Sequence, residues 1–160
     1  AMAPHNAFLL LQGLETLNLR MQQHVSNAQA MVTWLQQQDA VAWVNHPDIN
    51  ANAHTKLLFP KGAGSMLTFG VKGGRNAGAA FIDALQLSSN LANVGDSRTL
   101  VLHPGSTTHS RLSETDLVAA GIGADLIRVS VGIENLKDIQ ADFSLGLRAA
   151  AKVVAHQAEA

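Results

Sequence analysis

The stretch of sequence that decides the fold reads Leu126-Ile127-Arg128-Val129-Ser130-Val131. In a β-strand successive side chains point to opposite faces, so the three β-branched aliphatic residues share one face and Arg128 lies on the other. The aliphatic face predicts a strand inside a sheet, covered on that side by other elements. An arginine on the opposite face of such a strand is costly unless its guanidinium group meets an anion.

Strands and helices alternate around this stretch. Strand-like segments occur at residues 41–45, 65–71, 89–94, 97–102 and 126–131, the third and fourth forming a pair or one strand bent at Gly95-Asp96. Helical spacing of apolar residues occurs at 7–36, 51–58, 76–87, 113–120 and from 135 onward. Several connections are too short for parallel crossovers. The sequence therefore predicts an α+β fold, a small and mainly antiparallel sheet covered by helices on one side.

The first predicted helix extends beyond what a domain of this size can cover. At 1.5 Å per residue it would be about 45 Å long. Its first turns are apolar almost all round, with Phe8, Leu9, Leu10, Leu11, Leu14, Leu17 and Leu19. A helix apolar on every side is normally buried on every side. We therefore expect a long linker helix at residues 1–40, an α+β domain at residues 41–160, and partners outside this chain.

Composition gives the same indication and excludes several classes of protein. Of 160 residues, 47% are hydrophobic and only 14% are charged, and the net charge is −1. About 25% charged residues is typical of soluble domains, so part of the surface is expected to be covered, unless it is simply an alanine-rich helical surface. The small net charge gives no case for nucleic acid or an anionic membrane. The absence of cysteine excludes disulfides and thiolate zinc sites.

The sequence has no visible signal peptide and no apolar run long enough to span a bilayer. A soluble, cytoplasmic protein is therefore expected.

A polar loop follows the strand at 97–102 and reads His103-Pro104-Gly105-Ser106-Thr107-Thr108-His109-Ser110. Loops at strand ends are where ligands are usually held, although a self-capped turn would use the same hydroxyl residues. The two histidines could be metal ligands, but no third ligand is evident and the spacing matches no common site. No metal is expected.

Three interpretations of Arg128 remain open from the strand alone. The side chain could pair with an internal acid such as Asp96, or it could reach solvent at a sheet edge. Alternatively, its planar fork of donors could bind the carboxylate of a ligand, a geometry to which guanidinium is well matched.

Three segments together resemble a known family. They are SMLTFGVKGG (65–74), NVGDSRTL with HPGSTTH (93–100 and 103–109) and IRVSVGIE (127–134). In this order and spacing they resemble the C-terminal third of the Cys/Met-metabolism family of pyridoxal-phosphate enzymes, which have the type I fold. Within it they are most similar to O-acetylhomoserine sulfhydrylases (O-acetylhomoserine aminocarboxypropyltransferases). The opening residues 6–17 resemble the long helix that joins the two domains in that family.

The resemblance implies roles for three residues. Arg128 would bind the α-carboxylate of an amino-acid substrate. Asn93 would bond the same carboxylate at a position where many relatives carry serine, and Thr108 would line the pocket.

The resemblance also implies that pyridoxal phosphate is held by an N-terminal domain that precedes this segment. The cofactor lysine and the stacking tyrosine of the family belong to that domain, and this chain contains no tyrosine at all. Lys56 is expected to be a solvated helix lysine. No catalytic and no cofactor-binding residue is therefore expected in this chain.

The implied parent is a transferase that converts O-acetyl-L-homoserine and sulfide or a thiol to homocysteine or methionine, assembled as a homo-oligomer, typically a tetramer. One alternative is a fragment of a cystathionine γ-synthase or of a methionine γ-lyase-like enzyme. Another is a non-catalytic domain that binds amino acids or mediates assembly.

Overall fold

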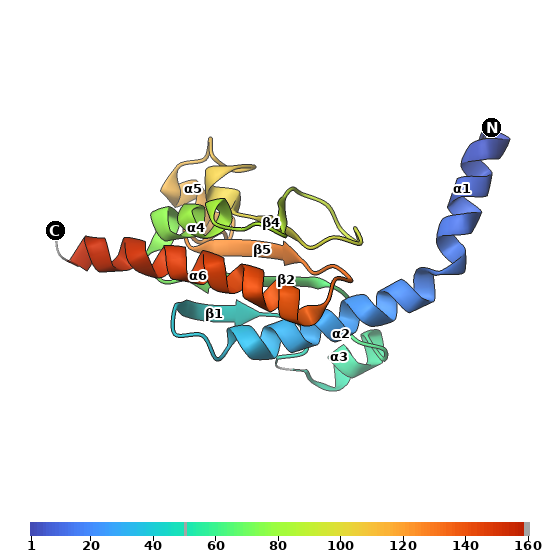
Figure 1. Ribbon diagram of the computed structural model, residues 1–160, viewed down its shortest axis with the longest axis horizontal. Coiled ribbons are helices and arrows are strands. Elements are labelled where there is room, and N and C mark those ends of the chain that lie inside the picture. The colour runs from blue at the N-terminus through green and yellow to red at the C-terminus, as the bar shows by residue number, and fades with distance from the viewer. Residues whose placement is uncertain (50, 159–160) are drawn as a thin grey trace.

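A five-stranded sheet forms the centre of the protein in the computed structural model, which describes residues 1–49 and 51–158 (Figure 1). Its strands are β1 (Val41–Asn45), β2 (Met66–Val71), β3 (Ser89–Asn90), β4 (Leu100–Leu102) and β5 (Leu126–Ser130). They lie side by side in the order β1-β2-β5-β4-β3, so β5 is the middle strand. All neighbours are antiparallel except β3 and β4. The predicted α+β class and mainly antiparallel sheet are confirmed.

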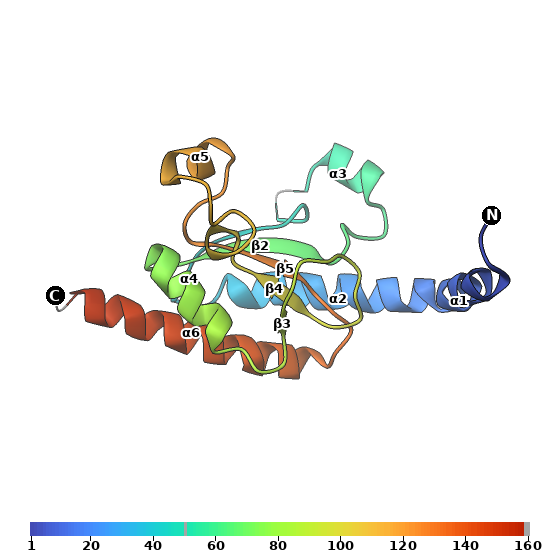
Figure 2. The same ribbon diagram turned by 90° about the horizontal axis from the view of Figure 1, so that it is seen from above.

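Three helices cover one face of this sheet: α2 (Leu17–Leu35), α4 (Gly74–Asp83) and α6 (Leu136–Ala158). Figure 2 shows them on one side, while the short helices α3 (Ala53–Leu58) and α5 (Glu114–Ala119) stand apart from each other on the opposite side. The second face of the sheet is thus flanked rather than covered. It is the face that carries Arg128.

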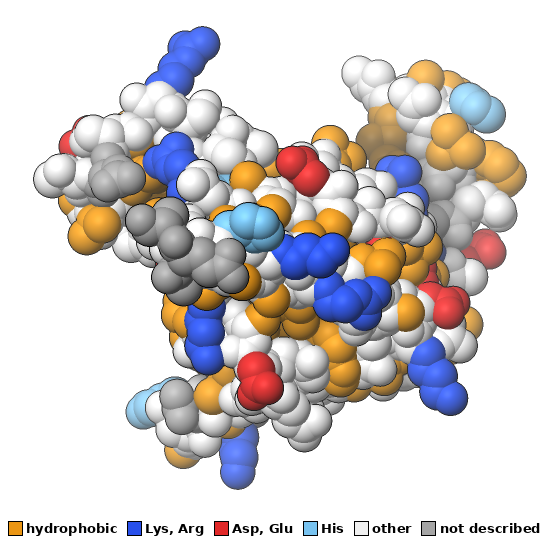
Figure 3. Space-filling view, turned by 60° about the vertical axis from the view of Figure 1, so that its left-hand side comes forward, with side chains coloured by type: hydrophobic (Ala, Val, Ile, Leu, Met, Phe, Trp, Pro, Cys, Tyr) orange, Lys and Arg blue, Asp and Glu red, His pale blue; other side chains and the backbone are white. Residues whose placement is uncertain are grey.

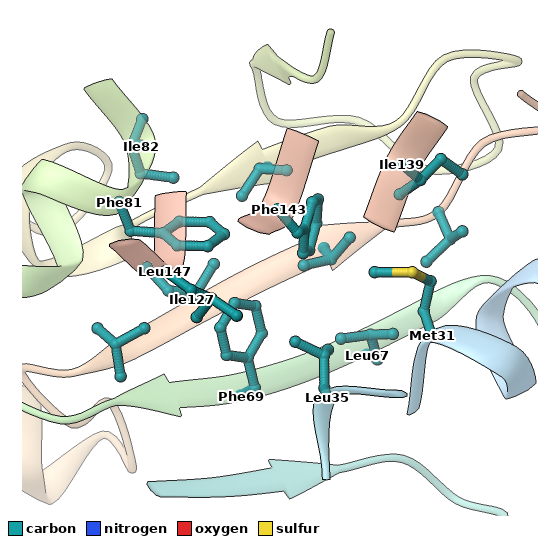
Figure 4. Packing of buried hydrophobic residues seen from close by; sticks show 14 of the residues in the cluster. Met31, Leu35, Leu67, Phe69, Phe81, Ile82, Ile127, Ile139, Phe143 and Leu147 are labelled. Carbon is teal, nitrogen blue, oxygen red and sulfur yellow. The ribbon is translucent and has the colours of Figure 1, made fainter. Parts of the chain in front are cut away.

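The covered face holds the hydrophobic core, which includes Ile127 and Val129 of β5 and Phe69 of β2. Phe69, Phe81 and Phe143 meet there, from β2, α4 and α6 (Figure 4). The ring centroid of Phe81 lies 5.4 Å from that of Phe69 and 5.4 Å from that of Phe143, and both pairs are edge-to-face. Burying each phenyl group contributes about 1.5–3 kcal/mol, and such ring pairs add to this. The alternation read from 126–131 is therefore correct.

The long first helix is divided, and this corrects the prediction of one helix at 7–36. Helix α1 (Pro4–Glu15) ends before Thr16, whose backbone (φ −104°, ψ 6°) leaves the helical region. The Thr16 hydroxyl and the Gly13 carbonyl both accept hydrogen bonds from the Arg20 guanidinium, which stabilises the break. Helix α2 packs Met31 and Leu35 into the core, whereas α1 has no buried residue and projects from the body (Figure 1).

The other boundaries differ from the prediction by a few residues. Helix α4 begins at Gly74, two residues before the predicted start, directly after Gly73, whose left-handed backbone (φ 100°) is one that glycine readily adopts. Only Ser89–Asn90 and Leu100–Leu102 of the two segments at 89–102 form strands, and they are parallel. Residues between them form a loop. In the described part of the chain, no helix combines the length and apolarity that crossing a membrane requires.

One buried carboxylate holds the turn that follows α4. Asp142 of α6 is 4% exposed and accepts the backbone N–H groups of Gln86, Leu87 and Ser88 at 2.7, 3.0 and 2.8 Å. Burial raises the pKa of Asp142, but these N–H donors outweigh burial and leave the pKa below its ordinary value. The ionised form therefore stabilises the fold.

We predict that Asp142→Asn lowers the free energy of unfolding by about 2–3 kcal/mol, because hydrogen bonds to a charged acceptor are lost. Since the folded-state pKa is lowered, the contribution of Asp142 is complete above its ordinary pKa of 3.8 and is lost as pH falls through the folded value. Urea unfolding of the chain measures both effects. The exposed Asp83→Asn is the matched control, and equal stability of the two variants would contradict the assignment.

Candidate functional site

Arg128 lies near the middle of the uncovered face of the sheet. It is half-buried on β5, opposite Thr68 of β2 and Leu102 of β4. Because β5 is the middle strand, the interpretation that Arg128 reaches solvent at a sheet edge is wrong. The neighbours of Arg128 along the strand, Ile127 and Val129, are fully buried in the core on the opposite face and fix the position of Arg128.

The guanidinium group of Arg128 has no acidic partner among the described residues. Its Nη2 donates one long hydrogen bond of 3.4 Å to the backbone carbonyl of Asn93. Asp96 pairs instead with Arg98, with 3.3 Å between Oδ1 and Nε, so the predicted alternative of an Arg128–Asp96 pair is wrong. Hydrogen bonds from the Arg98 backbone N–H and side chain hold the pKa of Asp96 below its ordinary value. Most donors of Arg128 are therefore free to meet a ligand.

A hollow of about 250 Å³ lies beside Arg128 and is large enough for a small carboxylate group. It is lined by Asn45, His46, Pro47, Met66, Leu67, Thr68 and Arg128. Asn45, Thr68 and Arg128 are paired in register across β1, β2 and β5, which places a row of polar residues across the sheet. Neither Asn45 nor Thr68 was predicted as a site residue. The alternation of the strand at 65–71 was the signal, since it sets Thr68 opposite the buried Leu67 and Phe69.

Asn93 lies beside Arg128 in the structure, but its backbone carbonyl and not its side chain makes the contact. The Asn93 side-chain oxygen accepts the N–H of Val94 at 2.8 Å, so the amide is folded onto its own loop. Thr108 is exposed, and its hydroxyl bonds to His109 Nδ1 at 2.8 Å. In the described structure Thr108 has no hydrogen bond to Arg128 or Asn93. The roles of all three residues toward a substrate remain predictions.

The polar loop after β4 is largely bonded to itself. His103 is fully buried and bonds the Ser106 hydroxyl at 2.8 Å and the Ala124 carbonyl at 2.9 Å. The Thr107 hydroxyl donates to the His103 carbonyl at 2.8 Å. These contacts match the self-capped turn. Within the described residues, no three His, Asp or Glu side chains gather closely enough to hold a metal ion.

These contacts define what the arrangement can do chemically. A half-buried guanidinium with free donors can bind and orient a carboxylate by two parallel hydrogen bonds. The lining of the hollow contains no lysine, cysteine or carboxylate, and the imidazole of His46, which also lines it, is buried. The geometry therefore supports binding and orientation, which are contributions of position rather than of bond chemistry.

A family model and several curated proteins match most of the chain. The model of the family described as Cys/Met metabolism PLP-dependent enzymes matches residues 1–148. A homocysteine synthase from Schizosaccharomyces pombe is 47% identical over 150 residues, which make up 92% of this chain and 35% of the relative. The chain thus spans about a third of the length of the curated relatives it matches.

Solved structures agree in fold over most of the chain. A Campylobacter jejuni structure assigned as an O-acetylhomoserine (thiol)-lyase is 40% identical with a TM-score of 0.79, and the match covers 92% of this chain and 36% of that one. Its chain contains a lysine that carries a pyridoxyl phosphate group. A cystathionine gamma synthase from Xanthomonas oryzae pv. oryzae is 34% identical with a TM-score of 0.81, covering 94% of this chain and 39% of its own.

The residues around Arg128 do not fit pyridoxal phosphate. The cofactor needs a lysine for its aldehyde and donors for its phosphate, and the hollow beside Arg128 offers no lysine. Lys56, the lysine that follows Thr55, is exposed on α3, as expected for a solvated helix residue. The hollow beside Arg128 is therefore not a site for the cofactor.

The buried His46 beside the hollow should make the stability of the fold depend on pH. Its Nδ1 accepts the Asp48 N–H at 3.2 Å, and its Nε2 is buried without a hydrogen-bond partner. Burial lowers the pKa of His46, against the opposing effects of the Asp48 carboxylate and the Gly64 carbonyl. The folded protein therefore resists protonation at a pH where the unfolded chain accepts a proton.

We predict that the free energy of unfolding falls as pH drops below 6.5, the ordinary pKa of histidine, until the lower folded-state pKa is reached. His46→Gln should flatten this pH dependence between about pH 7 and about pH 5. The exposed His54→Gln is the control and should keep it. Identical slopes for wild type and His46→Gln in urea unfolding would contradict the prediction.

Proposed function

Because the chain belongs to the family of Cys/Met metabolism PLP-dependent enzymes, we propose that it is the part of such an enzyme that binds the substrate carboxylate. The enzyme would convert O-acetyl-L-homoserine and sulfide or a thiol to homocysteine or methionine. Arg128 would hold the α-carboxylate, with Asn93 and Thr108 at the margin of the same pocket. The enzyme would act in the cytoplasm.

One observation carries the proposal. Arg128 presents a permanently charged group on the uncovered face of the sheet, and no carboxylate of the described residues lies within 4.0 Å of it. Leaving such a charge half-buried costs free energy unless an anion binds there in the working protein. The α-carboxylate of an amino acid is an anion of the right shape, and the relatives are named for reactions of amino-acid substrates.

Two features favour a sulfhydrylase over the cystathionine γ-synthase and methionine γ-lyase alternatives. Identity is higher to the homocysteine synthase (47%) and to the (thiol)-lyase structure (40%) than to the cystathionine gamma synthase structure (34%). The segment Asn93-Val94-Gly95-Asp96 also resembles the form that this loop would have in a sulfhydrylase. Rates of the full-length protein with sulfide, cysteine and methionine would separate the three activities.

The remaining parts of the enzyme would lie outside this chain. Pyridoxal phosphate would be bound by an N-terminal domain, where it would stabilise the carbanions formed on the substrate. Residues 1–40, which contain α1 and α2, would link that domain to residues 41–160. Arg128 would then contribute by orienting the substrate's α-carbon relative to the cofactor.

We predict that Arg128→Ala in the full-length, cofactor-loaded protein lowers kcat/KM for O-acetyl-L-homoserine by about a hundredfold or more, because the paired hydrogen bonds and charge are lost. Arg128→Lys should recover only part of the loss, since lysine lacks the planar fork. The exposed Arg148→Ala on α6 is the control. Unchanged kinetics of Arg128→Ala would refute the role of Arg128. A full-length protein without cofactor absorbance or activity would support the non-catalytic alternative instead.

The apolar side chains of α1 form an exposed surface in the structure. On α1, Phe8, Leu9, Leu10, Leu11 and Leu14 are each 54–62% exposed. On the face drawn in Figure 3, charged side chains are separated by broad hydrophobic and uncharged areas. Contiguous apolar surface of this kind usually marks an interface. We therefore propose that the protein is a homo-oligomer, as a tetramer or a smaller assembly.

We predict that the 160-residue chain alone is a dimer or larger in light scattering. Leu10→Glu with Leu14→Glu should shift it toward monomer, because both replace exposed apolar groups on α1 by charges. Lys152→Glu on the exposed surface of α6 is the matched control and should leave the mass unchanged. A monomeric mass for the unmodified chain would contradict the proposal.

A further inference from the structure

The loop that contacts Arg128 has little structure of its own. Residues 91–98, here called the Asn93 loop, join β3 to β4 without helix or strand, and all but Asp96 are exposed. Val94 is 61% exposed. Yet this loop supplies the Asn93 carbonyl that bonds Arg128. Something outside the loop must therefore fix its position.

The loop is tied to β5 and to the residues that follow it at successive points. Gly95 N–H donates to the Ser130 hydroxyl at 3.4 Å, and Ile133 N–H donates to the Ser97 carbonyl at 2.9 Å. These two bonds join neutral groups, and the Arg128–Asn93 bond is long at 3.4 Å. They guide the loop along β5 but are too weak to hold it alone.

The strongest contact is made by the carboxylate of Glu134, which bonds Thr99 at the C-terminal end of the loop. Glu134 accepts the Thr99 backbone N–H with one oxygen at 2.5 Å and the Thr99 hydroxyl with the other at 2.9 Å. The same hydroxyl accepts the Gly132 N–H at 2.9 Å, and Thr99 is fully buried. Hydrogen bonds to an ionised acceptor are roughly twice as strong as neutral ones.

The backbone around Glu134 is itself fixed in two ways. A Cβ atom at Gly132 would lie only 2.5 Å from the backbone of Arg98 and Thr99, so the close approach of the two segments requires glycine there. Asn27 of α2 donates its amide to the carbonyls of Gly132 and Glu134 at 3.0 and 2.9 Å. Glu134 is thus a rigid anchor and not a mobile surface acid.

We infer that Glu134 is a positioning residue for carboxylate binding at Arg128, acting through Thr99 and the Asn93 loop. With Glu134 in place, the Asn93 carbonyl occupies one donor of the guanidinium and orients the remaining donors toward the ligand. Without it, the loop loses the two bonds between the Glu134 carboxylate and Thr99, and Arg128 loses a fixed neighbour. This inference rests on the proposed role of Arg128 in substrate binding.

The test uses the full-length, cofactor-loaded protein and two readouts. The first is amide hydrogen exchange of residues 93–99. The second is the ratio of kcat/KM for O-acetyl-L-homoserine to that for its carboxamide, which has no carboxylate. Glu134→Ala should speed the exchange about tenfold and lower the ratio about tenfold, chiefly through KM. Asp138→Ala, an exposed acid four residues away, should change neither.

A second pair of variants covers the case in which Glu134→Ala fails to fold. Thr99→Ser keeps the hydroxyl and should behave as wild type, whereas Thr99→Val removes it and should show both changes. If Thr99→Val or a folded Glu134→Ala leaves loop exchange or the carboxylate ratio unchanged, the inference is overturned. Arg128→Ala separates the two levels, since a normal ratio in that variant would refute the proposed function itself.

Discussion

The permanent charge of Arg128, on a central strand whose other face is buried in the core, is the constraint on which the rest of the structure depends. A guanidinium group cannot be neutralised at any ordinary pH, so the fold must solvate it, pair it or leave it for a ligand. The structure does not pair it with an acid of the described residues, because Asp96 is engaged by Arg98. The charge is instead left facing a hollow, with one carbonyl at its side.

The two faces of the sheet differ in their surroundings: one is buried in the core, and the other carries Arg128 and the hollow. Below β5, three phenyl rings and the aliphatic residues of α2, α4 and α6 pack into a continuous core that fixes the strand. On the other face, polar and apolar residues together line the hollow, and the Asn93 loop contacts Arg128. Because a strand buried on one face cannot change register without exposing that core, Arg128 has a fixed position along the sheet. A positional role in catalysis requires that rigidity.

Much of this could be predicted from local patterns. The alternation at 126–131 places Arg128 opposite the core, and the spacing at 135–150 identifies the face of α6 that carries Ile139 and Phe143. The break at Thr16 escaped prediction because apolar spacing continues through it, and the Arg20 hydrogen bonds at the break come from a side chain one turn further on. The roles of Asn45, Thr68 and Glu134 also escaped prediction. Their contacts join residues far apart in sequence, and no local pattern records which strands become neighbours.

The central claim is that Arg128 holds the substrate carboxylate, and a crystal structure of the full-length protein with a bound substrate amino acid tests it most directly. If Arg128 has this role, both carboxylate oxygens will lie within about 3 Å of its guanidinium nitrogens, with the Asn93 loop beside them. A substrate carboxylate bound to other residues, with Arg128 facing solvent or paired with a protein acid, would contradict it.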